Sequence, residues 1–231
     1  CSMSNKKKDS AELTLTERIE GSLNSFLARN KKAAIIVLAV VVIGLITLGI
    51  VTSVNNKNLQ AQFNSIDLLE TAYSELQALG TEDEGYQAKY DELVAGLNDL
   101  AAKGNKYPSL KAQYLLGMLA FEKEEYQKAL DSFIATYSNA GKNYLASLAL
   151  TNAAVSAEEL GNDSLALEYY TKVIDEFGMS AAEAPKALFG QARLQEKRGN
   201  LELAKATFQQ LADQFPNSEF AKIATNRLAF L

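Results

Sequence analysis

Two stretches of equal length decide the fold: GNDSLALEYYTKVIDEFG at residues 161–178 and GNLELAKATFQQLADQFP at residues 199–216. Each begins with Gly-Asn, has an alanine five positions after the glycine, and has an aromatic residue four positions after that alanine. The Gly-Asn dipeptide indicates a turn between two helices. The alanine allows two antiparallel helices to approach closely, and the aromatic side chain one turn later fills the wider gap. Because one helix pair cannot bury its apolar face alone, such units have to stack into a solenoid.

The same pattern occurs once more, earlier in the chain. The small and aromatic residues are Ala129 with Phe133, Ala166 with Tyr170, and Ala204 with Phe208, at intervals of 37 and then 38 residues. A helix-breaking residue follows twelve positions after each alanine, at Gly141, Gly178 and Pro216. The first unit has Lys123-Glu124-Glu125 where the other two have Gly-Asn. We predict three helix pairs over residues 109–231, covered at the end by a capping helix from Ser218 to Leu231.

These positions resemble the tetratricopeptide repeat (TPR), whose consensus has Leu-Gly in its first helix and then Ala, an aromatic residue and Pro. Leu116-Gly117 matches the consensus in the first unit, whereas the middle unit has Ala153-Ala154 at that place. The interval exceeds the usual length of about 34 residues. The resemblance therefore predicts longer loops after Tyr137 and Phe177.

A degenerate helical pair is expected at residues 55–108, ahead of the regular repeats. Leu59 to Leu79 and Tyr86 to Ala102 have the apolar spacing of amphipathic helices. The turn between them, residues 80–85, lacks the alternating acidic positions of an EF-hand loop, so we expect no calcium site.

Residues 33–54, AAIIVLAVVVIGLITLGIVTSV, form an uncharged apolar run. As a helix this run would extend about 33 Å, enough to cross a hydrocarbon core of about 30 Å. It is longer than the apolar region of a cleaved signal peptide, which has about 7 to 15 residues. We predict an uncleaved transmembrane signal-anchor that binds the lipid bilayer. The predicted fold is all-α: one N-terminal transmembrane helix, then a TPR-like α-solenoid with a C-terminal capping helix.

The charges that flank the apolar run predict its orientation. Arg18, Arg29, Lys31 and Lys32 precede it within about 20 residues, and only Lys57 follows it. The positive-inside rule places residues 1–32 in the cytoplasm and the soluble domain across the membrane. In a bacterium this is a single-pass protein of the inner membrane with a periplasmic C-terminal domain.

The cytoplasmic segment, residues 1–32, contains an apolar stripe at helical spacing. Its members are Ile19, Leu23, Phe26 and Leu27. The stripe favours an interfacial helix on the membrane surface; docking on a partner and continuing the membrane helix are the alternatives. Cys1-Ser2 precedes Met3, which resembles a native start, so we interpret the dipeptide as a fusion scar. A lipidated cysteine is the alternative.

The residue types argue against most enzyme classes. The chain contains no histidine, and its only cysteine is Cys1. Histidine is the usual general base near neutral pH and the commonest metal ligand, and thiolates hold structural zinc. We therefore predict no catalytic residue, no metal site and no cofactor. The adjacent carboxylates Glu124-Glu125 and Glu158-Glu159 diverge by about 100° on a helix, which is typical of a solvated face.

The net charge is divided unevenly along the chain. Residues 1–32 carry seven basic and four acidic side chains, residues 33–54 carry none, and the whole chain has a net charge of −5. The part from Asn55 onward therefore has a net charge of −8. Because phosphate binding requires clustered Lys and Arg, this acidic domain argues against nucleic-acid partners.

The TPR resemblance implies a partner-binding concave groove lined by the first helix of each pair. The consensus register places there Tyr114, Met118 and Phe121 in the first unit, Thr151, Asn152, Val155 and Glu158 in the second, and Phe189, Arg193 and Glu196 in the third. The alternative is that several of these are core residues. TPR domains that bind C-terminal carboxylates use a Lys and Asn pair on one such helix, and neither of the first two units has it. The apolar lining favours a hydrophobic segment or a partner helix.

The order of segments is similar to that of the YfgM-like family, ancillary subunits of the bacterial Sec translocon. The local match is FLARNKKA at residues 26–33, which leads directly into the apolar run. This resemblance implies a periplasmic TPR domain whose partners are translocon subunits, a membrane-anchored periplasmic chaperone and exported polypeptides. The last repeat also resembles those of the outer-membrane assembly lipoprotein and the Tol-Pal coordinator. An envelope-assembly or cell-division scaffold, self-associating as a homodimer, is therefore the alternative.

Overall fold

The computed structural model describes residues 21, 24, 26 and 29–231, and all regular secondary structure in these residues is helical. It divides into two compact units, Cys1–Leu59 and Gln60–Leu231. The expected interfacial helix lies mostly outside the described residues, as does Cys1. Each unit is described by itself below.

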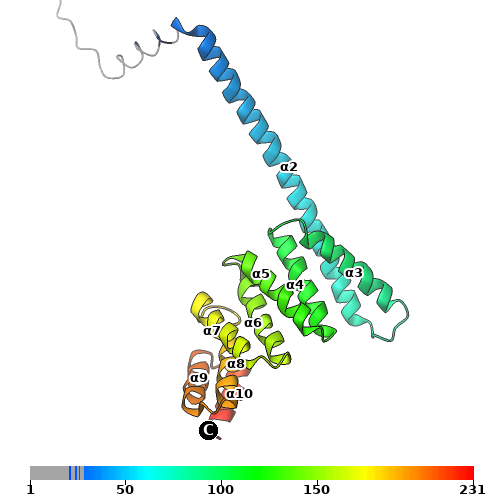
Figure 1. Ribbon diagram of the computed structural model, residues 1–231, viewed down its shortest axis with the longest axis vertical. Helices are drawn as coiled ribbons and strands as arrows, with labels where there is room; N and C mark the ends of the chain where they lie inside the picture. The colour runs from blue at the N-terminus through cyan, green and yellow to red at the C-terminus, as the bar shows by residue number, and fades with distance from the viewer. Residues whose placement is uncertain (1–20, 22–23, 25, 27–28) are drawn as a thin grey trace, which may run out of the picture. The chain divides into compact units, whose positions relative to one another are not determined.

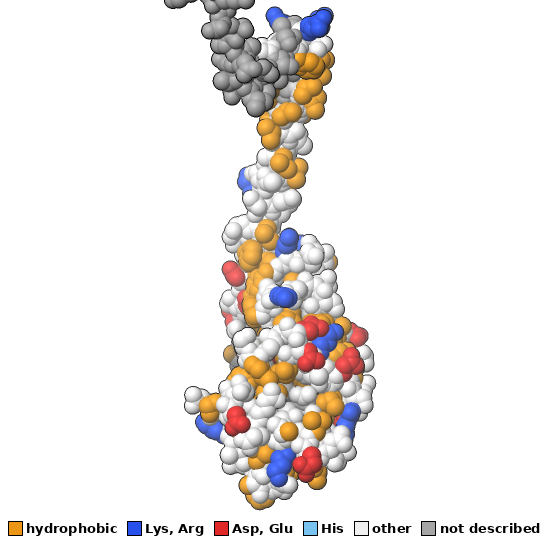
Figure 2. All heavy atoms as spheres, turned by 90° about the vertical axis from the view of Figure 1, so that its left-hand side faces the viewer, with side chains coloured by type: hydrophobic (Ala, Val, Ile, Leu, Met, Phe, Trp, Pro, Cys, Tyr) orange, Lys and Arg blue, Asp and Glu red, His pale blue; other side chains and the backbone are white. Residues whose placement is uncertain are grey.

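The described part of the first unit is dominated by the apolar portion of helix α2 (Lys31–Ala78). An 18-residue window of α2 has a mean hydropathy of 3.2, and none of that window is buried. The hydroxyls of Thr47 and Thr52 donate to the carbonyls of Ile43 and Leu48, at 2.8 and 2.9 Å, so the helix satisfies its own polar side chains. In Figure 2 hydrophobic side chains follow one another along this helix. By length and composition α2 can cross a membrane.

The second unit is a series of helices in which most pack on the next along the chain (Figure 1). After the C-terminal part of α2 these are α3 (Tyr86–Ala101), α4 (Tyr107–Glu122), α5 (Tyr126–Ala140), α6 (Tyr144–Glu159), α7 (Asp163–Phe177), α8 (Ala184–Lys197), α9 (Leu201–Gln214) and α10 (Glu219–Leu228). This nearest-neighbour packing is that of an α-solenoid. The predicted fold class is confirmed.

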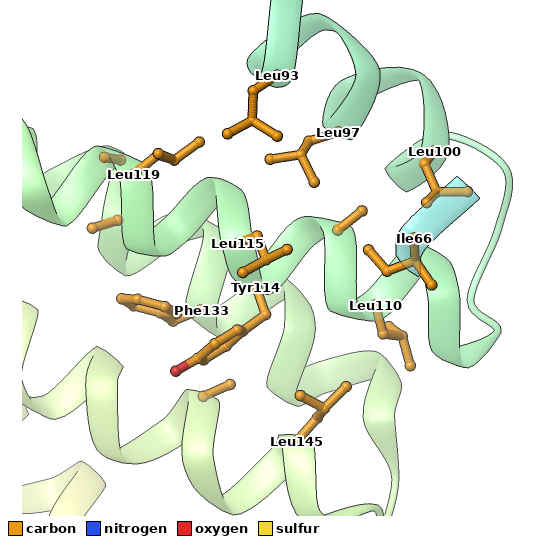
Figure 3. Close-up of a cluster of buried hydrophobic side chains, with 14 of the residues drawn as sticks. Ile66, Leu93, Leu97, Leu100, Leu110, Tyr114, Leu115, Leu119, Phe133 and Leu145 are labelled. Atoms are coloured by element: carbon orange, nitrogen blue, oxygen red, sulfur yellow. The ribbon is translucent and has the colours of Figure 1, made fainter. Parts of the chain in front are cut away.

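The C-terminal part of α2 packs into the solenoid as the first helix of the first pair. Ile66 and Leu76 are each 1% exposed, and Leu69 touches the place where Gly96 of α3 lacks a side chain. Glu122 of α4 accepts a hydrogen bond from the Tyr73 hydroxyl at 2.5 Å. These contacts form one core with α4 and α5, to which Leu97, Leu110 and Phe133 also contribute (Figure 3).

The turn inside each repeat has the same backbone. Gly161 and Gly199 have φ angles of 72° and 78°, and Glu124 takes the same place in the first repeat with φ 61°. In each turn the following residue donates its N–H to a carbonyl five positions earlier, as Asn162 does to Ala157 at 2.8 Å. This is the Schellman ending of a helix, which favours glycine.

The connections between repeats differ in length. Residues 178–183 connect α7 to α8, as the predicted longer loop requires. The longer loop predicted after Tyr137 is wrong, because α5 continues to Ala140 and leaves only residues 141–143 as the connection. No Gly or Pro interrupts the helix before Gly141, so it takes up the extra residues.

The predicted capping helix is confirmed as α10. The Ser218 side chain accepts a hydrogen bond from the N–H of Ala221 at 3.0 Å and so begins the helix. Ala221 and Ala224 are buried against Phe208 and Leu211 of α9 in the last core cluster. The helix therefore covers the apolar end of the third repeat.

Candidate protein-interaction surfaces

A chain of hydrogen bonds connects the first helices of the three repeats. Asn152 of α6 donates its Nδ2 to the Tyr114 hydroxyl of α4 at 2.8 Å and lies 3.7 Å from the Met118 sulfur. Lys186 of α8 donates its Nζ to the Asn152 Oδ1 at 3.3 Å. Burial raises the pKa of Tyr114 to about 12, against the opposing effect of the Asn152 hydrogen bond. We name these four residues the inner ladder.

A second polar link lies beside the inner ladder. Glu158 of α6 pairs with Arg193 of α8 and accepts a hydrogen bond from the Tyr170 hydroxyl at 2.8 Å. Burial, and then the neighbouring Glu158 carboxylate, raise the pKa of Tyr170. Glu196 of α8 accepts from Arg227 of α10 at 2.6 Å. These charged pairs link α6 to α8 and α8 to α10.

The remaining predicted groove residues contact side chains or backbone outside the predicted set. Phe189 packs on Phe208 and Phe220, with ring centroids 5.9 and 5.6 Å apart, and Phe121 lies edge-on to Tyr126 at 5.2 Å. Thr151 is fully buried, and its hydroxyl donates to the Ser147 carbonyl at 2.8 Å. Val155 is partly buried and packs against the second core cluster. The structure thus brings together Tyr114, Met118 and Asn152, and separately Glu158 and Arg193.

Lys186 is the residue of this surface that the sequence interpretation missed. Burial lowers the pKa of its amine, partly offset by the charge of Glu183. Within the described residues no carboxylate forms an ion pair with it. A Lys and Asn pair is thus formed between α8 and α6 and not within one helix. A search of inward positions across adjacent repeats would have found it.

A trough runs between α3 and α5, both of which pack on α4. It encloses about 510 Å³. Its floor is formed by Leu116, Leu119 and Ala120 of α4, and its walls by Tyr90 and Val94 of α3 and by Lys128, Asp131 and Ser132 of α5. On each helix these residues recur at three- or four-residue intervals, so one face of each of three helices lines the trough. We name it the α3–α5 trough.

The corresponding place in the next repeat is filled. Lys128 and Ser132 of α5 correspond to Leu165 and Tyr169 of α7, which pack against the cores around α6. Gln113 and Leu116 of α4 are only partly buried. Their counterparts Leu150 and Ala153 of α6 are 0% exposed. The trough therefore arises at Gln113, Lys128 and Ser132 of the first repeat, three positions where the second repeat has large apolar side chains.

Comparisons with known proteins agree with this architecture. The tetratricopeptide repeat family model matches residues 148–178 and 186–218, which cover most of α6–α7 and of α8–α9. The chain is 28% identical over 170 residues to a TPR repeat-containing protein of Treponema pallidum (strain Nichols), spanning 70% of each chain. The second unit is a TPR-like α-solenoid. Repeats of this kind form protein-interaction modules, so the solenoid is a surface for binding other proteins.

Two solved structures are similar to this chain, and the first of them shows the same fold. A tetratricopeptide repeat protein from Parabacteroides merdae is 21% identical with a TM-score of 0.54, and the alignment covers 71% of this chain and 59% of that structure. The Arabidopsis OM64 TPR domain is 21% identical with a TM-score of 0.47, over 55% of this chain and 98% of that domain. The chain therefore spans less than two thirds of the Parabacteroides structure.

Proposed function

We propose that this protein is a membrane-tethered TPR adaptor that binds proteins on the extracytoplasmic side of a bacterial inner membrane. Its partners would be translocon subunits, a membrane-anchored periplasmic chaperone and exported polypeptides. The apolar, unburied window of α2 supports the anchor, and the basic residues ahead of it support a cytoplasmic N-terminus. The resemblance of FLARNKKA at residues 26–33 to the YfgM-like family supports translocon subunits as partners.

The α3–α5 trough is the observation that carries the protein-binding role. Three helix faces with an apolar floor form a groove for a fourth helix, the arrangement in which amphipathic helices bind. Asp131 on its wall has no basic partner within the described residues. We therefore assign the trough to an amphipathic partner helix that presents leucine-like side chains to Leu116 and a basic residue to Asp131.

The inner ladder supports a second contact with a protein partner, at Lys186. Lys186 is a partly buried cation held by Asn152, and a carboxylate that reached it would gain a charge-assisted hydrogen bond. An extended segment with an acidic group fits this position. Of the groove residues predicted from the sequence, Tyr114 and Met118 would then hold Asn152, and Asn152 would hold Lys186.

The decisive experiment is site-specific crosslinking from Leu116 in native membranes, followed by mass spectrometry. Recovery of translocon subunits is expected, and recovery of outer-membrane assembly proteins alone would favour the alternative scaffold. The double variant Lys128→Leu with Ser132→Tyr introduces the side chains of the second repeat and should fill the trough. We expect at least tenfold less crosslinking from this variant, while the control Lys205→Leu on the exposed face of α9 keeps it.

A second variant distinguishes binding at the inner ladder from binding in the α3–α5 trough. Lys186→Met removes the inner cation and leaves the trough unchanged. A loss of crosslinking with Lys186→Met but not with the filled trough would move the principal site to the inner ladder. Unchanged crosslinking in both would contradict both assignments.

A further inference from the structure

Two connections between helix pairs contain the same four residue types in a different order and lie side by side. GNKY, residues 104–107, leads into α4, and GKNY, residues 141–144, leads into α6. The two tyrosine hydroxyls, of Tyr107 and Tyr144, are hydrogen-bonded at 2.8 Å, and their ring centroids lie 6.3 Å apart. The ring of Phe63 in α2 stacks on Tyr107 at 6.0 Å. Three aromatic rings from α2, α4 and α6 thus form a row along one edge of the solenoid.

The same edge carries two unpartnered cations. Lys106 and Lys142 are exposed, and neither forms an ion pair within the described residues, whereas Lys103 nearby pairs with Asp99 at 2.7 Å. Tyr144 is 58% exposed. The next connection, residues 178–183, contains no lysine. We name Lys106, Tyr107, Lys142 and Tyr144 the basic–aromatic edge.

This pairing of residue types fits a bilayer surface. Tyrosine has an apolar ring and a polar hydroxyl, and it is enriched at the level of the lipid headgroups. Lysine side chains near a membrane are attracted to anionic headgroups. Lys106 and Lys142 are the cations of this edge, although the chain from Asn55 onward has a net charge of −8. Acidic side chains lie near them, because Glu183 lines the same hollow as Lys142 and Tyr144, and the charges of Glu70 and Asp67 act on Tyr107. The attraction to an anionic lipid surface would therefore come from the two lysines themselves, neither of which forms an ion pair within the described residues.

The stretch of chain between the apolar span and this edge is short. Phe63, which stacks on Tyr107, comes nine residues after Val54, the last residue of the uncharged run. Nine residues extend at most about 32 Å even when fully stretched. The tether therefore limits the distance between the edge and the end of the span, whatever the angle between the two units.

We propose that the basic–aromatic edge binds the headgroups of anionic phospholipids in the bilayer that holds the apolar part of α2. This inference rests on the membrane anchor of the proposed function. Lys106 and Lys142 would contact lipid phosphates, and Tyr144 would enter the headgroup layer. The contact would fix the solenoid at the membrane surface with one edge toward the lipid.

The test uses the full chain in vesicles of phosphatidylcholine, alone or mixed with phosphatidylglycerol. A fluorophore is attached at Asn105→Cys in a chain with Cys1→Ser, and the vesicles carry a nitroxide quencher on the headgroup. We expect quenching to be at least threefold stronger with phosphatidylglycerol and to fall at high salt, because salt screens exposed charges. Lys106→Glu with Lys142→Glu should remove this difference.

The control carries the same change of charge elsewhere. Lys205→Glu with Lys222→Glu alters α9 and α10 and should leave quenching unchanged. Lys106→Gln with Lys142→Gln provides a milder variant, and circular dichroism checks that each variant is folded. Equal quenching with and without phosphatidylglycerol would overturn the lipid contact alone. A chain that does not float with either vesicle would overturn the anchor and, with it, this inference.

Discussion

The first and second repeats have the same helices in the same order but differ at their surfaces. In the second repeat Leu165 and Tyr169 of α7 pack over α6, and Leu150 beneath them is 0% exposed. In the first repeat the corresponding residues of α5 are Lys128 and Ser132, and a trough of about 510 Å³ remains over α4. Side chains at two positions of the second helix therefore decide whether this surface of a repeat is closed or open.

The turns inside the two repeats have the same backbone but different residues. The second repeat has Gly161 with φ 72°, and the first has Glu124 with φ 61°, a left-handed conformation that disfavours side chains. The first repeat therefore combines a polar trough wall, a floor that is partly exposed at Leu116, and an unfavourable turn residue. Departures from local folding preferences concentrate at functional sites, and this supports the first repeat as the principal binding unit.

The largest effect is expected where the closed repeat is made to resemble the open one. Leu150→Gln introduces the residue that α4 has at position 113 into a fully buried place. The variant loses apolar packing and buries an amide, so the free energy of unfolding should fall by about 4 kcal/mol. Urea denaturation followed by circular dichroism measures the change.

The reciprocal substitution serves as its control. Gln113→Leu adds an apolar side chain at a partly exposed position, so stability should change by less than about 0.5 kcal/mol. Equal and opposite effects of the two substitutions would mean that the two repeats bury these positions alike.

A smaller effect is expected when the open repeat is closed. In the variant Lys128→Leu with Ser132→Tyr, the added ring should cover Leu116 and Gln113. The free energy of unfolding should rise by about 1 kcal/mol, since apolar surface leaves water. Thermal denaturation of this variant beside the wild-type chain measures it. A lower melting temperature would show that the trough cannot hold these side chains, and the variant would then no longer test partner binding.

The repeat spacing was sufficient to predict most of the fold. The glycine turns, the small and aromatic pairs and Ser218 each depend on nearby residues, so they identified three helix pairs and α10. The continuation of α5 to Ala140 was missed because helix length between breakers depends on packing that periodicity does not contain.

The sites were harder to predict because they join separate helices. The trough needs one face from each of α3, α4 and α5. It stays open because Lys128 and Ser132 do not cover α4 as Leu165 and Tyr169 cover α6. The Lys186–Asn152 pair joins positions 34 residues apart in different repeats. The predicted groove residues were chosen by register alone, which does not show that Thr151 is fully buried or that Glu158 is paired with Arg193.

The smallest expected effect concerns the turn of the first repeat. Glu124→Gly gives that turn the residue that Gly161 provides in the second repeat, and it relieves a left-handed glutamate. The relief is partly offset by the greater freedom of glycine in the unfolded chain, so we expect a gain of about 0.5 kcal/mol in urea denaturation. Glu124→Ala removes the same charge but keeps the backbone cost, and it should give no gain. Equal gains from both variants would assign the effect to charge, and the first repeat would then be no more strained than the second.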